Sequence, residues 1–118
     1  MKFVQTDYGN RKEILKFPDH YVNMPITVDD TGVTANADGK KIVPAGTVMG
    51  GGVLTDASKL ATKANDGTAE GVLFYDVDVS YGPAPGALTI HGFIDLQKLP
   101  ETPSAEAIEA LKQITFIA

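Results

Sequence analysis

Turn-forming residues divide this sequence into short β-forming segments, and this division limits the possible folds more than any other feature. Residues 25–28 (PITV) precede DDTG, residues 32–36 (GVTAN) precede ADGK, and residues 40–43 (KKIV) end at Pro44. Glycine adopts positive φ without steric cost, so Asp38-Gly39 predicts a hairpin turn. We therefore expect a domain built mainly from short β-strands.

Two later segments have the periodicity of half-buried strands. Residues 71–79 (GVLFYDVDV) alternate, and residues 87–96 (ALTIHGFIDL) alternate again after a rigid turn at residues 81–86 (YGPAPG). Gly92, within the second segment, predicts a bulge or a close backbone approach. In the first segment, one face would carry Leu73, Tyr75, Val77 and Val79, and the other Val72, Phe74, Asp76 and Asp78.

One helix is expected close to the C-terminus. Thr102 is a suitable N-cap, Pro103 fits the first helical position, and residues 104–113 (SAEAIEALKQ) are rich in helix formers. Residues 114–117 (ITFI) then predict a last strand. The predicted fold is mostly β (α+β): a small, compact β-sandwich or barrel-like domain with one short C-terminal helix before a final strand. Ala105, Ile108 and Leu111 would share one face of the helix.

The first twenty residues differ from the rest in charge and pattern. Residues 1–20 carry a net charge of +1 and the remainder −6, and Pro18 ends any helix started by RKEILKF. We predict that residues 1–20 form an N-terminal arm that needs a partner surface to be ordered, and that residues 21–118 form a single β-rich domain. The alternative is an edge strand at residues 2–5 that folds onto the domain itself.

Composition excludes several classes of function. The 118 residues are 43% hydrophobic, enough for one domain with a core, and the net charge of −5 argues against nucleic-acid or anionic-membrane partners. The absence of cysteine removes disulfides, thiolate metal sites and cysteine nucleophiles, and suits a cytosolic product. The start predicts no signal peptide, and the longest uncharged stretch, residues 42–55, holds a proline and four glycines, so no membrane helix is expected.

The glycine-rich segment at residues 41–52 (KIVPAGTVMGGG) raises the question of phosphate binding. A P-loop requires a lysine and a serine or threonine directly after its last glycine, followed by a helix. Here Gly52 precedes the β formers Val53 and Leu54, and no lysine follows before Lys59. We therefore expect a turn at Pro44 and Gly46, a strand at residues 47–49, and no bound cofactor.

No catalytic or metal-binding pattern is evident. DDTG and NADG resemble parts of a calcium loop but lack its glutamate and flanking helices, so turns are expected. Asp76 and Asp78 would point the same way on a strand, either as a functional pair or, more commonly, as a solvated face. His20 and His91 have no metal-ligand spacing, so a metal site would need distant partners. We predict a non-enzymatic protein with an exposed face or protomer interface that includes Tyr75, Tyr81, His91 and Phe93.

The order of several short motifs resembles a known family. These are the IVPAGT turn at residues 42–47, GVL with a following DV at 71–77, GFID with KLP at 92–100, and the terminal ITFI at 114–117. In this order they resemble the small head fibre or head decoration proteins of tailed phages and prophages and, more distantly, the lambda head decoration protein. The resemblance covers roughly residues 40–118 and lacks the long helical fibre of some relatives.

This resemblance implies a structural role on a virion. It implies a protein that is made in the bacterial cytoplasm, binds the outer capsid surface of the virion and stabilises the head. Its partners would be the major capsid protein and, in a homotrimer, further copies of itself. The apolar anchors expected on the arm are Phe3, Val4, Ile14, Leu15 and Phe17. The alternative is a glycan- or host-surface-binding module with Tyr75, Tyr81 and Phe93 on its binding face. For a third possibility, a small enzyme, the only candidate catalytic residues are Asp76, Asp78 and His91.

Overall fold

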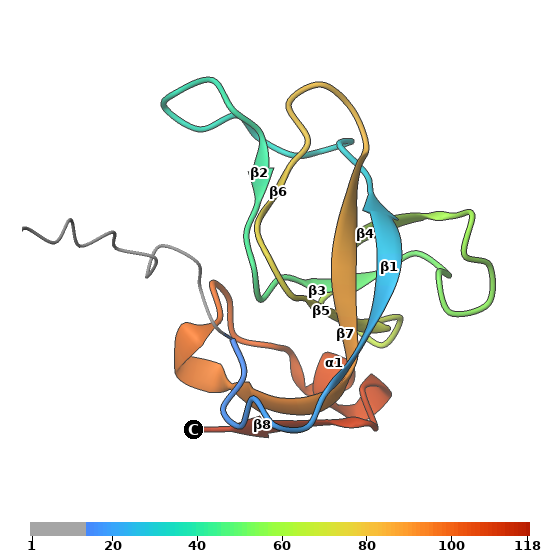
Figure 1. The fold of residues 1–118 in the computed structure, drawn as a ribbon, viewed down its shortest axis with the longest axis vertical. Coiled ribbons are helices and arrows are strands. Elements are labelled where there is room, and N and C mark those ends of the chain that lie inside the picture. Colours follow the sequence, from blue (N-terminus) through green and yellow to red (C-terminus); the bar gives the residue numbers. More distant parts are fainter. Residues whose placement is uncertain (1–13) are drawn as a thin grey trace, which may run out of the picture.

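The fold is built around a ring of five hydrogen-bonded strands. The structure, a computed structural model, describes residues 14–118 (Figure 1). The strand order in the sheet is β1-β4-β3-β5-β7-β8, and β1 also pairs with β7. The first five strands of this order therefore close into a small barrel, and β8 lies outside it. These strands are β1 (Val22–Val28), β3 (Val48–Gly50), β4 (Leu60–Lys63), β5 (Gly71–Leu73) and β7 (Ala84–Asp95). Closure leaves the barrel without free edges.

The long strand β7 belongs to two parts of the domain. Its first part, Ala84 to His91, pairs antiparallel with β1, and its last part, Gly92 to Asp95, pairs parallel with β8 (Ile114–Ile117). A small separate sheet joins β2 (Ile42–Val43) to β6 (Val77–Asp78). Figure 1 shows β7 running along the molecule from the turn beside β6 to the end where α1 and β8 lie. The predicted mostly β fold with a helix before the last strand is confirmed.

Two apolar clusters lie on opposite faces of β5. Val72 and Leu73 are adjacent in sequence, and both are fully buried because one side chain enters each cluster. The barrel cluster consists of Ile26, Val28, Val43, Met49, Val53, Ala61, Leu73, Val77, Val79 and Leu88. The second cluster, beside α1 and β8, consists of Ile14, Leu15, Ala45, Val48, Ala69, Val72, Phe74, Ile94, Ala107, Leu111 and Ile114.

Residues 71–79 do not form the one continuous strand that their alternation predicts. The pairing of β5 ends at Leu73, and β6 begins at Val77 with a different partner strand. The intervening bend buries Phe74, which is 6% exposed, and leaves Tyr75 39% exposed. The predicted division into two faces is therefore wrong, because the chain must change sheets between Leu73 and Val77.

Helix α1 (Ala105–Ala110) is one turn shorter and begins later than expected. Ser104 is the N-cap, and its hydroxyl accepts a hydrogen bond from the Ala107 N–H at 3.0 Å. Ser104 rather than Thr102 is the N-cap because the side-chain oxygen of Asn65 accepts a hydrogen bond from the Ser104 N–H at 2.7 Å. Ile108, expected on the same helix face as Leu111, is 43% exposed, whereas Leu111 is 4% exposed. A 3-10 turn, η1 (Leu96–Lys98), precedes the helix. No helix among residues 14–118 is long and apolar enough to cross a membrane.

Gly92 produces the predicted irregularity in β7. The pairing of β1 with β7 slips at this point, so that Val22 faces His91 and Asn23 faces Thr89, which leaves Ile90 as the extra residue of a bulge. Gly92 has φ of +151°, and a Cβ there would lie 3.2 Å from the Cβ of Tyr21. Glycine is required because the chain at residue 21 crosses directly over it.

The Asp38-Gly39 turn forms, but not as a hairpin between strands. Gly39 has φ of +78°, and the side-chain oxygen of Asn36 accepts hydrogen bonds from the N–H groups of Asp38 and Lys40. Residues 33–36 form no strand. The predicted turn chemistry is therefore present in a loop that precedes β2.

The folded domain includes residues that the sequence assigned to the arm. The Ile14 carbonyl accepts from the Asp95 N–H, and the Lys16 N–H donates to the Phe93 carbonyl, both at 2.8 Å. Ile14 is 0% and Leu15 4% exposed, so these two expected capsid anchors are instead core residues of their own domain. The boundary predicted after residue 20 therefore needs correction: residues 14–20 pack with the domain. Phe3 and Val4, with the rest of residues 1–13, lie outside the described residues.

Candidate functional site: an aromatic surface

Seven aromatic and histidine side chains gather where residues 14–21 cross the end of β7. Phe17 meets Phe93 edge to face with ring centroids 5.6 Å apart, and Tyr21 stacks on Phe74 at 5.3 Å. Phe74 in turn contacts Tyr75 at 4.4 Å. We call this group the aromatic surface: Phe17, His20, Tyr21, Phe74, Tyr75, His91 and Phe93.

Backbone geometry explains why these rings meet. Ile14 and Leu15 fix the segment in the core, and Gly92 lets the chain at Tyr21 cross β7 closely. The bend after Leu73 presents Phe74 and Tyr75 to the same region. Phe17, Tyr21 and Tyr75 remain 50%, 42% and 39% exposed, although aromatic rings normally contribute to cores. Clustered exposed aromatic side chains on a rigid scaffold are typical of binding surfaces.

His20 and His91 form a direct contact within this surface. Their Nε2 atoms are 2.8 Å apart, and their ring centroids are farther apart, at 4.8 Å, so the rings meet through these nitrogens. The Nδ1 atom of His91 is buried and has no hydrogen-bond partner in the described part of the chain. The two histidines, 71 positions apart, are thus the distant partners that a metal site would need. Among residues 14–118, however, no group of three His, Cys, Asp or Glu residues could hold a metal ion.

The predicted exposed face is only partly assembled by the structure. Tyr75, His91 and Phe93 all belong to the aromatic surface, and Phe17, expected on the arm, joins them. Tyr81 is fully exposed in the turn before β7 and makes no ring contact with another aromatic side chain of residues 14–118. His20, Tyr21 and Phe74 were not predicted on this face, because the crossing over Gly92 brings His20 and Tyr21 to it and the bend after Leu73 brings Phe74.

The glycine-rich segment binds an anion that the chain itself supplies. The Glu70 carboxylate accepts hydrogen bonds from the N–H groups of Gly52 at 2.7 Å, Val53 at 2.9 Å and Leu54 at 3.3 Å. Gly51 and Gly52 have φ of +108° and +86°, which turns these successive amides toward one point. The loop therefore has the local form of an anion nest, but Glu70 occupies it as a structural contact.

Asp76 and Asp78 do not act as a carboxylate pair. Asp76 lies outside β6, and its Oδ1 accepts from the Ala45 N–H at 2.6 Å. Asp78 accepts from the N–H and hydroxyl of Ser80, and the hydroxyl contact, followed by the N–H contact, holds the pKa of Asp78 below its usual value. Asp76 binds a backbone N–H 31 positions away, whereas Asp78 binds one that is two positions away. Because Asp78 lies in β6 and Asp76 does not, the expectation that both point the same way from one strand is wrong.

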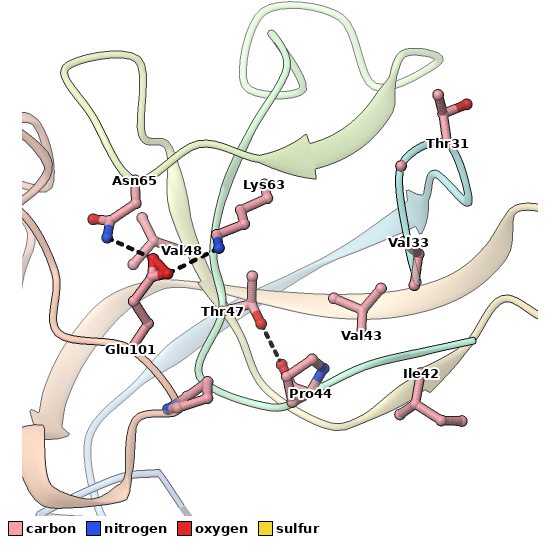
Figure 2. A pocket seen from close by; sticks show the side chains of 12 residues that line it. Thr31, Val33, Ile42, Val43, Pro44, Thr47, Val48, Lys63, Asn65 and Glu101 are labelled. Carbon is pink, nitrogen blue, oxygen red and sulfur yellow. Dashed lines mark hydrogen bonds and ion pairs between the residues drawn. The ribbon is translucent and has the colours of Figure 1, made fainter. Parts of the chain in front are cut away.

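A groove of about 320 Å³ lies between β2, β3 and the chain after η1 (Figure 2). At one end, Glu101 binds Lys63 at 2.8 Å and the Asn65 amide at 3.1 Å. The hydrogen bond from Lys63, then that from Asn65, lowers the pKa of Glu101. The polar groups that Figure 2 shows at this end are therefore paired with one another. The apolar lining residues are Val33, Ile42, Val43, Pro44, Val48 and Pro100.

No local signal in the sequence indicates this groove, because its lining comes from four separate segments. No model of a known protein family matches the sequence, and no curated protein matches it either. The surfaces described above, and the motif order in the sequence, are therefore the basis for a functional proposal.

Proposed function

We propose that this protein is a non-catalytic capsid decoration protein of a tailed phage or prophage, which binds the outside of the head and stabilises it. The observation that carries the proposal is the aromatic surface. Its exposed rings come from a segment anchored in the core and from a closed barrel, so little conformational entropy is lost when a partner covers them. The motif order that resembles head decoration proteins supplies the class of partner, the major capsid protein.

The aromatic surface has the composition of a protein–protein contact. Aromatic side chains are enriched in the centres of such interfaces, where a few residues account for most of the binding free energy. Tyr21 and Tyr75 combine a large apolar ring with a hydroxyl, which suits a contact that is exposed before assembly. A homotrimer would present three such surfaces to the shell, and repeated weak contacts would combine through effective concentration.

Binding to shells tests this proposal. Capsids assembled from the major capsid protein of the same genome would be sedimented with wild-type protein and with a Tyr21→Ala/Tyr75→Ala variant. We expect the variant to lose affinity by a factor of about 30 or more, the size of one interface hot spot. Tyr81→Ala is the matched control, because Tyr81 is the fully exposed tyrosine outside the surface. We expect it to bind as wild type does.

Two results would contradict the proposal at different levels. Equal binding by the double variant and wild type would mean that the aromatic surface is not the capsid contact. Absence of wild-type binding to any shell of the same genome would contradict the decoration function itself. Light scattering tests the trimer separately, because a mass of one chain both free and after release from shells would exclude it.

A glycan- or host-surface-binding module is the second candidate. The exposed rings of Tyr21 and Tyr75 favour it, because aromatic faces also stack on sugar rings. A glycan array with wild-type protein distinguishes the two functions: a saturable ligand that is lost in the Tyr21→Ala/Tyr75→Ala variant would support the module over the decoration protein.

A further inference from the structure

The groove of Figure 2 lies where a hairpin opens after its first pair of residues. The Asn36 N–H donates to the Lys40 carbonyl at 2.7 Å, and the Lys40 N–H donates to the Asn36 side-chain oxygen at 3.1 Å. In the same antiparallel register Thr34 would pair with Ile42, but no hydrogen bond joins these two residues. Figure 2 shows Val33 on one side of the groove and Ile42 on the other.

The edge of β2 on this side has one open position. Because β2 and β6 are antiparallel, the N–H and C=O groups of successive β2 residues point alternately toward β6 and away from it. The Lys41 carbonyl accepts from the Val79 N–H at 2.8 Å, so Lys41 and Val43 point toward β6 and Ile42 points away. Neither the N–H nor the C=O of Ile42 has a hydrogen-bond partner among residues 14–118.

The positions on either side of Ile42 along this edge are already paired. Lys40 is bound by Asn36, and the Pro44 carbonyl accepts from the N–H and the hydroxyl of Thr47 at 3.3 and 2.7 Å. An extended segment in the groove would therefore pair with a single residue of β2, through two hydrogen bonds, as in peptide recognition by strand addition.

The groove suits a short apolar segment. Most of its lining is apolar, and its volume of about 320 Å³ is at the lower end of the range for binding sites, about 300–1,000 Å³. We propose that the groove binds residues 2–5 (KFVQ) of this same chain, which lie outside the described residues. Phe3 and Val4 would contact the apolar lining, and the backbone of this segment would pair with Ile42.

The arm leaves the domain close to the groove. The Ile14 carbonyl accepts from the Asp95 N–H at 2.8 Å, and Leu15 pairs antiparallel with Ile94, so the chain before Ile14 departs from the η1 end of β7. Pro100, on the groove wall, follows Asp95 by five residues. At no more than about 3.5 Å per residue, Ile14 is within about 25 Å of Pro100, and the nine residues from 5 to 14 can span about 30 Å.

Charge and residue type also favour this segment as the occupant. Residues 1–13 hold three basic and two acidic residues, a net charge of +1, and the total of −5 leaves −6 on residues 14–118. The arm is therefore attracted to the domain. Phe3 and Val4 are the only adjacent apolar residues among residues 1–13, and both are strand formers. The contact belongs to the free chain, so this inference does not rest on the proposed function.

Hydrogen exchange at the Ile42 amide tests the contact in the full chain. A short linker gives an effective concentration of about 1 mM, so a contact with a Kd of about 0.1 mM would be formed about nine-tenths of the time. We therefore expect the Ile42 N–H to exchange about tenfold faster in Phe3→Ser/Val4→Ser than in wild type. Tyr8→Ser is the control within the arm and should exchange as wild type does. The Val43 N–H, which points toward β6, should be unaffected in both variants.

Equal exchange at Ile42 in wild type and in Phe3→Ser/Val4→Ser would overturn the proposal. An equal increase in Tyr8→Ser would also overturn it, because the contact would then not be specific to residues 2–5.

A spin label identifies which chain supplies the segment. Wild type has no cysteine, so Thr6→Cys provides one site for a nitroxide. In a uniformly labelled sample, we expect the amide signals of Val33 and Ile42 to broaden. In a mixture of spin-labelled chains with ¹⁵N-labelled chains that carry no nitroxide, they should stay sharp. Broadening in the mixture would assign the groove to the arm of a second copy instead. No broadening in either sample would exclude the arm as its occupant.

Discussion

The carboxylate of Glu70 is the single side chain on which the glycine-rich segment most depends. Glu70→Ala would remove the acceptor for three successive amides, those of Gly52, Val53 and Leu54. The first two contacts are short, at 2.7 and 2.9 Å, and the third is long, at 3.3 Å. Val53 is 2% exposed and belongs to the barrel cluster, so loss of these hydrogen bonds would also affect a residue of the core.

The magnitude follows from the number of effective hydrogen bonds. A hydrogen bond to a charged group contributes about 1.5–3 kcal/mol, and such contributions are less than additive when one group makes them all. Leu54 is half exposed, so water can replace the acceptor of its N–H. We therefore expect Glu70→Ala to lower the free energy of unfolding by about 2–3 kcal/mol, with Tm lower by about 10 °C for a domain of this size.

Urea and thermal unfolding of Glu70→Ala and Glu70→Gln measure this effect. Glutamine keeps one side-chain oxygen for Gly52 and Val53 but loses the charge, so we expect a cost of about 1 kcal/mol. The emptied nest of Glu70→Ala should also accept a free anion, so phosphate should raise the Tm of this variant more than that of wild type. An alanine variant as stable as wild type, or one that phosphate does not stabilise preferentially, would refute the reasoning.

Two further predictions concern the barrel and its loops. In Gly71→Ala, the new Cβ would lie 2.6 Å from Leu88 Cγ and 2.7 Å from the Thr89 carbonyl oxygen, so the free energy of unfolding should fall by about 3 kcal/mol. Gly67→Ala is the control, because it has open space around it and should change the free energy of unfolding by less than about 0.5 kcal/mol. Equal effects of the two variants would contradict this packing. The hydroxyls of Ser58 and Thr68, followed by their N–H groups, lower the pKa of Asp56 and Asp66 in the folded chain. These contacts therefore contribute fully above the ordinary aspartate pKa near 4 and are lost as the pH falls through the lowered values. The stability difference between wild type and Ser58→Ala/Thr68→Ala should consequently shrink from pH 6 to pH 2.5, and a pH-independent difference would exclude this linkage.

The sequence was most informative where structure is encoded locally. Turn residues and strand periodicity predicted a mostly β domain with a helix before the last strand, and the glycine within the longest strand predicted its bulge. Residues 105–110 form a helix because their own propensities favour it. Gly92 marked the bulge in the sequence, although the crossing that requires glycine there is made by the distant Tyr21.

Errors arose where a distant residue decides a local feature. The N-cap moved from Thr102 to Ser104 because Asn65, 39 positions earlier than Ser104, binds the Ser104 N–H. The alternating segment after Gly71 broke into two strands because its two parts pair with different partners. Ile14 and Leu15 have the polar context of an arm, yet pairing with β7 places them in the core.

The sequence by itself determined the class of the fold, the places where the chain turns, and the absence of a P-loop pattern, because short-range sterics and hydrogen bonding are sufficient for these. Only the tertiary structure decided that β1 closes the ring with β7, that Glu70 occupies the glycine-rich nest, and that His20 meets His91. Such contacts depend on which distant segments bury their apolar faces together, and that is a property of the whole chain rather than of any segment within it.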